Sequence, residues 1–397
     1  MKILFTGGGT GGHTFPLIAI IREIRKLYSG EGLEFFYIGP KPARNASPVR
    51  QPDGSHGGGR SDAGGEEFGS ILLSQEDVRI KTISAGKIRR YFSFQNIIDI
   101  LFKIPWSVVQ SFYYLIKIDP HLIFSKGGPG SLSVTLAAKI LRIPIFLHES
   151  DIVPGLSNRV TSKWAEKVFI SFPKTEYFDL SKTILVGNPI RSEILDGSKE
   201  RAKELFNLTL EKPVFLFMGG SQGAEFINNF VLEILNKLLE SFEIIHICGI
   251  PNLKETQGEA QVVINKDLEK YYHLYPFLDE EKLKHAYRAA DLAICRSGAG
   301  SIFEIAAVGL PSILVPLPSA AANHQAKNAY SYAETGAAVI MEEDNLRPNF
   351  FLEKIQHIFA SPDNLKKMKE EALRFSKPLA AKTIARNILE YLTLGPK

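Results

Sequence analysis

Short apolar runs alternate with amphipathic stretches along nearly the whole chain, and this rhythm limits the folds that it can adopt. Each run is rich in β-branched or aromatic residues, has about the length of a strand, and precedes a stretch with helical periodicity. The alternation predicts βα units around parallel sheets, an α/β fold. The runs are KILFTG, LEFFYIG, LIFSKGG, IPIFLHE, KVFIS and TILVG in the first half, and VFLFMGG, IIHICG, QVVIN, LAICRSG, SILVPL and AAVIM in the second.

Two domains are expected, because 397 residues exceed what one hydrophobic core usually serves. Pro189 interrupts the strand pattern in the polar stretch VGNPIRSEILDG, which indicates a boundary beside it. We therefore predict domains at residues 1–188 and 189–377. Residues 378–397 have the periodicity of an amphipathic helix, which we expect to pack back on the first domain.

The segment 42–69 does not follow the βα rhythm. It is rich in Gly, Pro, Ser and charged residues and poor in large apolar ones. Such a segment cannot bury enough surface to offset its loss of conformational entropy, so we predict a flexible loop.

Composition favours a reducing, cytoplasmic compartment. The two cysteines, Cys248 and Cys295, are too few and too far apart for a disulfide framework or a zinc cluster. The opening MKILFTGGG is typical of a buried strand rather than of a signal peptide. The apolar stretch 97–118 contains Asp and Lys residues and is a poor candidate for a transmembrane helix.

Charge is unevenly distributed along the chain. Residues 1–190 carry 23 Lys and Arg against 16 Asp and Glu, and the remainder carries 24 against 27. A basic half beside an apolar, aromatic segment suits an anionic membrane face or an anionic substrate, although an ordinary solvated surface explains the charge equally well. No nucleic-acid motif is present. The candidate membrane patch comprises Phe92, Phe94, Ile97, Ile98, Leu101, Phe102, Ile104 and Trp106, with Lys87, Arg89, Arg90 and Lys103 among them.

The first strand leads into a glycine turn, GGGTGGH, and helical periodicity begins at Phe15. Glycines let the backbone approach a ligand closely, and a helix start offers N–H groups to an anion. We predict that Thr10, Gly11 and Gly12 contact a phosphate or diphosphate; a turn without a ligand is the alternative. A nicotinamide cofactor is disfavoured, because the second strand ends without the acidic residue that holds a ribose.

Two further glycine turns follow strands of the second half. GGSQGA places Ser221 and Gly223 where they can contact a second phosphate. RSGAGS contains Ser297 and is followed, about one helical turn on, by Glu304, a candidate for binding a ribose diol. The helix starts after GGGTGGH and GGSQGA, one in each half, can bind the two ends of a diphosphate-linked substrate.

These turns occur with SKGGPGSLS, HESDIVPGLSNR, VGNPIR and NHQAKNA, and in that order and spacing the set resembles the MurG family. Its members are UDP-N-acetylglucosamine transferases that convert lipid I to lipid II in peptidoglycan synthesis. The resemblance covers nearly the whole chain. It implies the GT-B fold, an α/β fold with two Rossmann-like domains whose parallel sheets face an interdomain cleft. It also implies an inverting mechanism without an obligatory metal or other cofactor.

The resemblance also implies partners and site residues. The first domain would bind lipid I at the cytoplasmic face of the cell membrane, to which the protein would be peripherally attached. The second would bind UDP-N-acetylglucosamine, and no nucleic acid is expected. Matching positions place Ser221 and Gln222 at the diphosphate, Arg191 near the phosphates, Glu304 at the ribose and Gln325 at the sugar hydroxyls.

Two residues compete for the role of general base. His13, beside the first glycine turn, can accept a proton from the attacking 4-hydroxyl of N-acetylmuramic acid, or it can merely hydrogen-bond backbone or diphosphate. The resemblance makes Glu149, at a strand end, the rival. The family commonly has His-Glu-Gln-Asn where this chain has HESD, so Asp151 replaces an amide and, when ionised, only accepts hydrogen bonds.

Two other functions remain open at this point. A UDP-N-acetylglucosamine 2-epimerase would share the two domains and the nucleotide site, but SKGGPGSLS and the aromatic basic segment favour the transferase. A sugar-nucleotide-binding subunit that needs a partner for catalysis is disfavoured because both halves occur in one chain.

Overall fold

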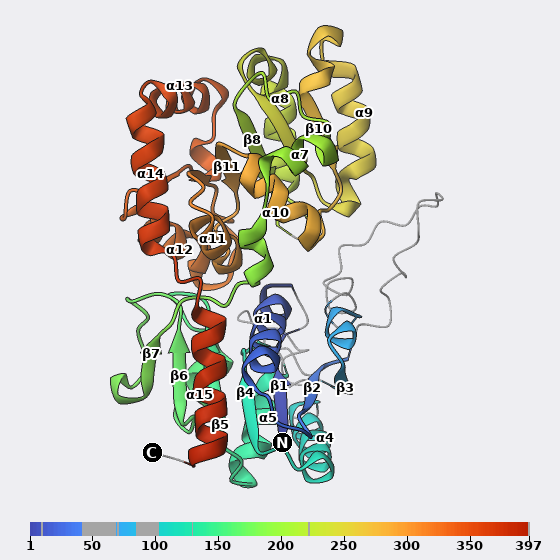
Figure 1. Ribbon diagram of the computed structural model, residues 1–397, viewed down its shortest axis with the longest axis vertical. Helices are drawn as coiled ribbons and strands as arrows, with labels where there is room; N and C mark the ends of the chain where they lie inside the picture. The colour runs from blue at the N-terminus through green and yellow to red at the C-terminus, as the bar shows by residue number, and fades with distance from the viewer. Residues whose placement is uncertain are drawn as a thin grey trace. The chain divides into compact units, whose positions relative to one another are not determined.

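The protein forms two α/β units, shown by a computed structural model (Figure 1). One unit contains Met1–Pro189 and Leu379–Lys397, and the other contains Ile190–Pro378. The predicted flexible loop at 42–69 lies, except for Gly69, outside the part of the chain that the structure describes. That part comprises residues 1–8, 11–41, 69, 71–84, 103–128, 130–220 and 223–395.

The first unit contains a seven-stranded parallel sheet in the order β3-β2-β1-β4-β5-β6-β7. Its strands are β1 (Lys2–Thr6), β2 (Glu34–Pro40), β3 (Val78–Ile83), β4 (Leu122–Ser125), β5 (Ile145–Glu149), β6 (Lys167–Ile170) and β7 (Thr183–Leu185). β1 pairs with β2 on one side and with β4 on the other, so the strand order reverses there. In such sheets, ligands bind outside the carboxyl ends of the strands at the reversal.

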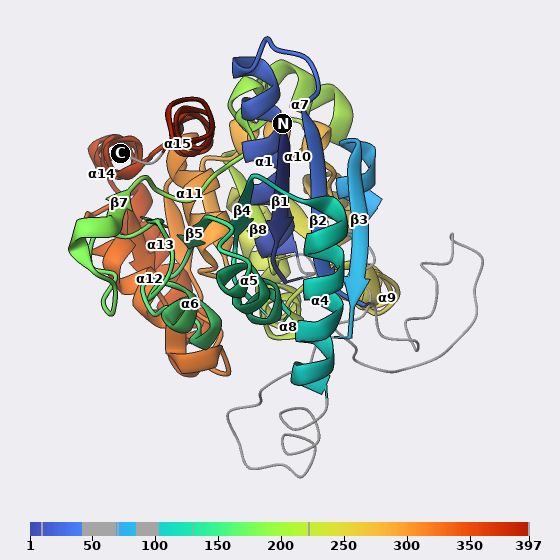
Figure 2. The same cartoon turned by 90° about the horizontal axis from the view of Figure 1, so that it is seen from below.

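Helices cover both faces of this sheet (Figure 2). They are α1 (Gly11–Leu27), α4 (Ile104–Ile118), α5 (Ser131–Ile140), α6 (Leu156–Thr161) and α15 (Ala380–Leu394). Because side chains alternate along a strand, Ile3 and Phe5 face the core beneath α1 and α15, whereas Leu4 faces the core beneath α4 and α5. Ile384 and Ile388 of α15 are fully buried, so the last helix belongs to the core of the unit in which the chain begins.

The second unit contains a six-stranded parallel sheet in the order β10-β9-β8-β11-β12-β13, with its reversal between β8 and β11. Phe215 and Phe217 of β8 pack in one core with α8 and α13. The strands are β8 (Val214–Met218), β9 (Glu243–Ile247), β10 (Tyr272–Tyr275), β11 (Leu292–Cys295), β12 (Ser312–Leu314) and β13 (Ala338–Ile340). The helices are α7 (Lys199–Phe206), α8 (Glu225–Ser241), α9 (Leu253–Val263), α10 (Glu280–Ala289), α11 (Ala299–Ala307), α12 (His324–Ala333), α13 (Pro348–Phe359) and α14 (Pro362–Phe375).

The parallel α/β architecture predicted from the alternation is confirmed, but one predicted strand is wrong. The run QVVIN begins inside α9 rather than in a strand. Thr256 and Ala260 are buried one helical turn apart, whereas Val262 is 84% exposed, as expected for a helix with one buried face. Two strands, β3 and β10, were not predicted.

Candidate active site

Polar side chains of the first unit gather at the carboxyl ends of three neighbouring strands. His13 lies in the first turn of α1, just after β1; Lys126 directly follows β4; and His148 and Glu149 end β5. These strands are adjacent in the sheet and flank the reversal of strand order. The sequence therefore places its polar groups at the edge where a doubly wound sheet binds ligands.

The first glycine turn brings the backbone close to His13. Gly11 and Gly12, two predicted phosphate contacts, are the first residues of α1, and Thr10 lies outside the described residues. A Cβ on Gly12 would meet no described atom within 4 Å, but a Cβ on Gly8 would lie 2.8 Å from Cδ2 of His13. A larger residue at position 8 would therefore displace the imidazole.

His13 has an uncommitted ring nitrogen. Its Nδ1 is enclosed and has no hydrogen-bond partner among the described residues. Burial and the nearby Lys126 ammonium lower the pKa of His13 to about 4, against opposing contributions from Asp151 and the Lys126 backbone. The imidazole is therefore neutral at physiological pH. A buried polar atom without a protein partner is the arrangement expected where a ligand completes the hydrogen bond.

Lys126 connects β4, β5 and the residues that lead into the second unit. Its Nζ donates to Nδ1 of His148 at 2.8 Å, to Oδ1 of Asn188 at 3.4 Å and to Oγ of Ser150. Because an ammonium only donates, Nδ1 of His148 is unprotonated, and Nε2–H donates to the carbonyl of Gly187 at 3.0 Å. The tautomer of His148 is thus fixed by its two neighbours.

Glu149 organises the loop that follows β5. Its carboxylate accepts from the N–H of Asp151 at 3.0 Å, from the N–H of Gly155 at 3.2 Å and from Nδ2 of Asn158 at 2.8 Å. Burial, followed by the nearby Asp151 carboxylate, raises the pKa of Glu149 above its ordinary value. The described contacts therefore occupy both oxygens of this carboxylate with donors from the loop after β5 and from α6.

The second glycine turn, between β8 and α8, requires glycine at two positions. Gly220 and Gly223 have φ of 91° and 76°, and a Cβ on Gly223 would lie 2.1 Å from the carbonyl oxygen of Cys248. Ser221 and Gln222, predicted at the diphosphate, lie outside the described residues.

Replacing Gly223 with alanine should therefore destabilise the second unit. The substitution combines a positive φ with a backbone clash, so we expect a loss of about 3 kcal/mol in the free energy of unfolding. Chemical denaturation measures it. Gly258→Ala is the matched control, because Gly258 lies in α9 with open space around it. Alanine there should raise the free energy of unfolding by up to about 1 kcal/mol. Equal stability of the two variants would show that the turn relaxes.

An ion-pair cluster of the second unit joins Arg191 to α10 and α11. Arg191 is buried and contacts Glu304 of α11 at 3.0 Å and Glu280 of α10 at 3.5 Å. The hydroxyl of Tyr287 donates to the other carboxylate oxygen of Glu304 at 2.9 Å. The carboxylates raise the pKa of Arg191 despite its burial. Two predicted site residues, Arg191 and Glu304, are thus brought together from positions far apart in sequence.

The third turn brings together two other predicted residues. Oγ of Ser297 donates to the backbone carbonyl of Gln325 at 2.8 Å, and Nδ2 of Asn328 contacts the carbonyl of Ser297 at 3.5 Å. Oε1 of Gln325 accepts from the N–H of Leu317 at 3.1 Å. Ser297 follows β11 and Gln325 lies in the first turn of α12, so both lie beside the strand reversal of this sheet.

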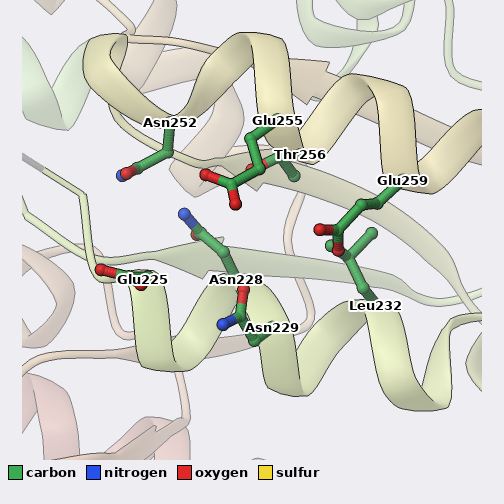
Figure 3. Close-up of a pocket in the computed structure, with 8 residues that line it drawn as sticks. All are labelled: Glu225, Asn228, Asn229, Leu232, Asn252, Glu255, Thr256 and Glu259. Atoms are coloured by element: carbon green, nitrogen blue, oxygen red, sulfur yellow. The ribbon is translucent and has the colours of Figure 1, made fainter. Parts of the chain in front are cut away.

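A separate hollow between α8 and α9 is unsuited to a nucleotide diphosphate (Figure 3). It is lined by the carboxylates of Glu225, Glu255 and Glu259, which would repel an anion. No predicted site residue that the structure describes lines it.

Sequence reasoning missed Lys126, Asn188 and Tyr287. Lys126 stands directly after the apolar run LIFS, the position at which a parallel strand delivers a side chain to its carboxyl edge, and this signal could have identified it. Asn188 and Tyr287 have no comparable local signal.

Comparison with protein families assigns a glycosyltransferase domain to each of the two α/β units. Residues 64–170 match the glycosyltransferase family 28 N-terminal domain, and residues 214–384 match the glycosyltransferase family 28 C-terminal domain. With two parallel α/β units, the protein is thus a glycosyltransferase of family 28.

Individual relatives identify the group within glycosyltransferase family 28 to which the chain belongs. The chain is 34% identical, over 94% of its own length and 94% of the relative's, to the UDP-N-acetylglucosamine--N-acetylmuramyl-(pentapeptide) pyrophosphoryl-undecaprenol N-acetylglucosamine transferase of Clostridium tetani. The crystal structure of Acinetobacter baumannii MurG superposes with a TM-score of 0.70 at 26% identity, covering 98% of this chain and 99% of that one. The chain belongs to the MurG family of N-acetylglucosaminyltransferases, as its motifs predicted.

The epimerase fold is also similar. A UDP-GlcNAc 2-epimerase from Neisseria meningitidis superposes with a TM-score of 0.65 at 16% identity, covering 98% of this chain and 100% of that one. At this identity the likeness concerns the fold alone.

Proposed function

We propose that this protein transfers N-acetylglucosamine from UDP-N-acetylglucosamine to the 4-hydroxyl of the N-acetylmuramyl group of lipid I, with inversion at the transferred carbon. The observation that carries the proposal is the match, over 94% of both chains, to the N-acetylglucosamine transferase of Clostridium tetani described above. The first unit binds the acceptor and the second binds the donor.

His13 acts as the general base. Its neutral imidazole and uncommitted Nδ1 support this role, because a base must be unprotonated at the working pH. Glu149, whose oxygens accept from the loop after β5 and from Asn158 of α6, instead supports the segment that carries Asp151. Gly11, Gly12 and Thr10 contact the acceptor.

The residues of the second unit bind the sugar nucleotide. Helix N-termini and Arg191 stabilise the charge that develops on UDP as the sugar-phosphate bond breaks. Glu304 binds the ribose and Gln325 the sugar hydroxyls. Ser297 supports Gln325 through its backbone carbonyl. The turn residues Ser221, Gln222 and Gly223 contact the diphosphate.

Transfer of radiolabel tests the proposal. Purified protein is incubated with labelled UDP-N-acetylglucosamine and a short-chain lipid I analogue, and label in the lipid fraction is measured. We expect transfer that depends on the acceptor. Release of N-acetylmannosamine without transfer would indicate an epimerase. Binding of UDP with neither product would indicate a subunit that needs a partner.

The protein binds the cytoplasmic face of the membrane through α4. Within the described ranges, no helix has both the length and the apolar character needed to cross a bilayer. Trp106, Val109, Tyr113 and Ile116 form one stripe along α4 and are each 57–59% exposed. α4 lies beside α5 in the outer helical layer (Figure 2). An exposed apolar stripe of this kind suits insertion among lipid headgroups.

The proposed membrane segment therefore shifts along the chain. Of the patch predicted from the sequence, only Lys103, Ile104 and Trp106 lie among the described residues. Lys103 precedes the helix and Lys117 lies in its last turn, which adds positive charge at both ends of the stripe.

Removing two aromatic side chains from the stripe should weaken membrane binding. We expect Trp106→Ser with Tyr113→Ser to lower the partition coefficient onto anionic vesicles roughly tenfold or more, because each ring loses its buried apolar area. Vesicle co-sedimentation measures it. Val262→Ser, which removes an exposed apolar side chain from α9, is the control. Unchanged partition of the double variant would place the membrane contact elsewhere.

A further inference from the structure

A line of buried hydrogen bonds lies behind the second glycine turn. His246 of β9 and Asn228 of α8 are 0% and 2% exposed, and Nε2 of the imidazole lies 3.0 Å from Oδ1 of the amide. Nδ2 of Asn228 donates to the carbonyl oxygen of Cys248, just after β9, at 3.0 Å. On the other side of the imidazole, Nδ1 lies 2.8 Å from the hydroxyl of Tyr272 in β10. Four residues from three elements are thus joined in one line.

The direction of each of these hydrogen bonds is fixed. A carbonyl oxygen only accepts, so Asn228 turns its amide nitrogen toward Cys248 and its oxygen toward His246. Nε2 of His246 therefore carries the hydrogen, and Nδ1 accepts from Tyr272. Burial lowers the pKa of His246 to about 3, so the imidazole is neutral at physiological pH. A buried polar network whose hydrogen bonds are all made holds its members in one arrangement.

The carbonyl of Cys248, at the end of this line, lies against Gly223 of the turn. It accepts a second hydrogen bond, at 2.7 Å, from Nδ2 of Asn252, which directly precedes α9 (Figure 3). A Cβ on Gly223 would lie 2.1 Å from the carbonyl oxygen and 2.5 Å from Nδ2 of Asn252. The backbone of Gly223 therefore packs directly on a carbonyl that two side-chain amides hold in place.

We propose that Asn228 and Asn252 are positioning residues for binding of the sugar nucleotide. By fixing the carbonyl of Cys248, they hold Gly223 and the start of α8 where the diphosphate binds. Both amides act through Gly223 rather than on the donor itself. Apolar side chains of similar size would fill the same space but would leave the buried carbonyl without a donor. The inference deepens the proposed function and rests on its assignment of the diphosphate to this turn.

Two uncharged substitutions test the two amides. Asn228→Leu removes both hydrogen bonds of that side chain and adds no charge near an anion. Asn252→Ala removes only the second donor to Cys248, so it gives a result even if Asn228→Leu fails to fold. Asn236→Leu is the matched control further along α8. Its amide also donates to a backbone carbonyl, that of Val263 at 2.6 Å, and accepts from the N–H of Asn265 at 2.9 Å.

The readout is the Kd of the full-length protein for UDP, measured by titration calorimetry, with Tm measured in parallel. In Asn228→Leu we expect the Kd to rise about tenfold, the change in affinity to which loss of one buried hydrogen bond corresponds. In Asn252→Ala we expect a rise of about threefold, because Asn228 still donates to the carbonyl. In Asn236→Leu the Kd should not change.

Kinetics connects this change to the reaction. The KM for UDP-N-acetylglucosamine should rise with the Kd for UDP, whereas the KM for the lipid I analogue should keep its wild-type value. An unchanged Kd in Asn252→Ala or in folded Asn228→Leu would overturn the inference, and so would an equal rise in Asn236→Leu. A purely structural role would lower Tm without changing the Kd. Failure of the proposed function is seen separately, as wild-type protein that does not bind UDP or does not transfer label.

Discussion

Replacing His13 with alanine should lower kcat for transfer by roughly 10²–10⁴-fold, the range that a general base contributes. Binding of UDP-N-acetylglucosamine should be retained, because His13 lies in the first unit and the proposed donor site lies in the second. Transfer of radiolabel gives kcat, and titration calorimetry gives the affinity for the donor. His357→Ala, which removes an exposed histidine of α13, is the matched control.

Glu149→Gln discriminates between the two candidate bases. Glutamine has one acceptor oxygen and presents an NH₂ group to the donors that the carboxylate now accepts, so we expect lower thermal stability together with a moderate loss of activity. If Glu149→Gln instead abolished transfer at unchanged stability while His13→Ala remained active, the base would be Glu149.

Replacing Glu304 with alanine should affect both stability and donor binding. The change removes the closer carboxylate from the buried Arg191 and leaves Glu280 at 3.5 Å, and breaking such a buried pair costs about 3 kcal/mol. For a unit of this size, that corresponds to a fall of roughly 6–12 °C in Tm. The KM for UDP-N-acetylglucosamine should rise as well, because the ribose loses its acceptor.

Two further variants make this result specific. Glu204→Ala breaks an exposed pair with Arg201 and should cost less than about 1 kcal/mol. Glu304→Gln keeps an oxygen that Arg191 can contact, so its Tm should lie between those of Glu304→Ala and the wild type. If Glu304→Ala were as stable as Glu204→Ala, the pair with Arg191 would contribute nothing. Lost stability with an unchanged KM would exclude the ribose role.

The sheets were predictable because buried parallel strands are continuous apolar runs. VFLFMGG and KILFTG are continuous apolar runs that end in glycine, and both patterns predict a buried parallel strand followed by a turn. VRIKTI in β3 alternates with charges, and YHLY in β10 is short and polar, so neither resembled a buried strand. QVVIN was predicted wrongly for the opposite reason: Val262 and Val263 have β-branched side chains, which favour strands, yet they form the exposed C-terminal end of α9.

The site was predictable where local sequence carries the chemistry. A glycine turn between a strand and a helix is recognisable in the sequence, and Gly223 and His13 were predicted as site residues from such turns. The contact of Arg191 with Glu304 spans 113 positions and depends on tertiary packing, which no local pattern encodes. The position of Lys126 directly after LIFS was a local signal, but its contacts with His148 and Asn188 depend on tertiary packing.

The return of α15 to the first unit affects how the protein is made. When residue 189 leaves the ribosome, the core beneath α1 still lacks Ile384 and Ile388. At about 5–20 residues per second, synthesis of the second unit takes roughly 10–40 s, during which that apolar surface awaits its last helix. The unit that begins first is thus completed last, and its nascent chain exposes an aggregation-prone apolar surface throughout that interval.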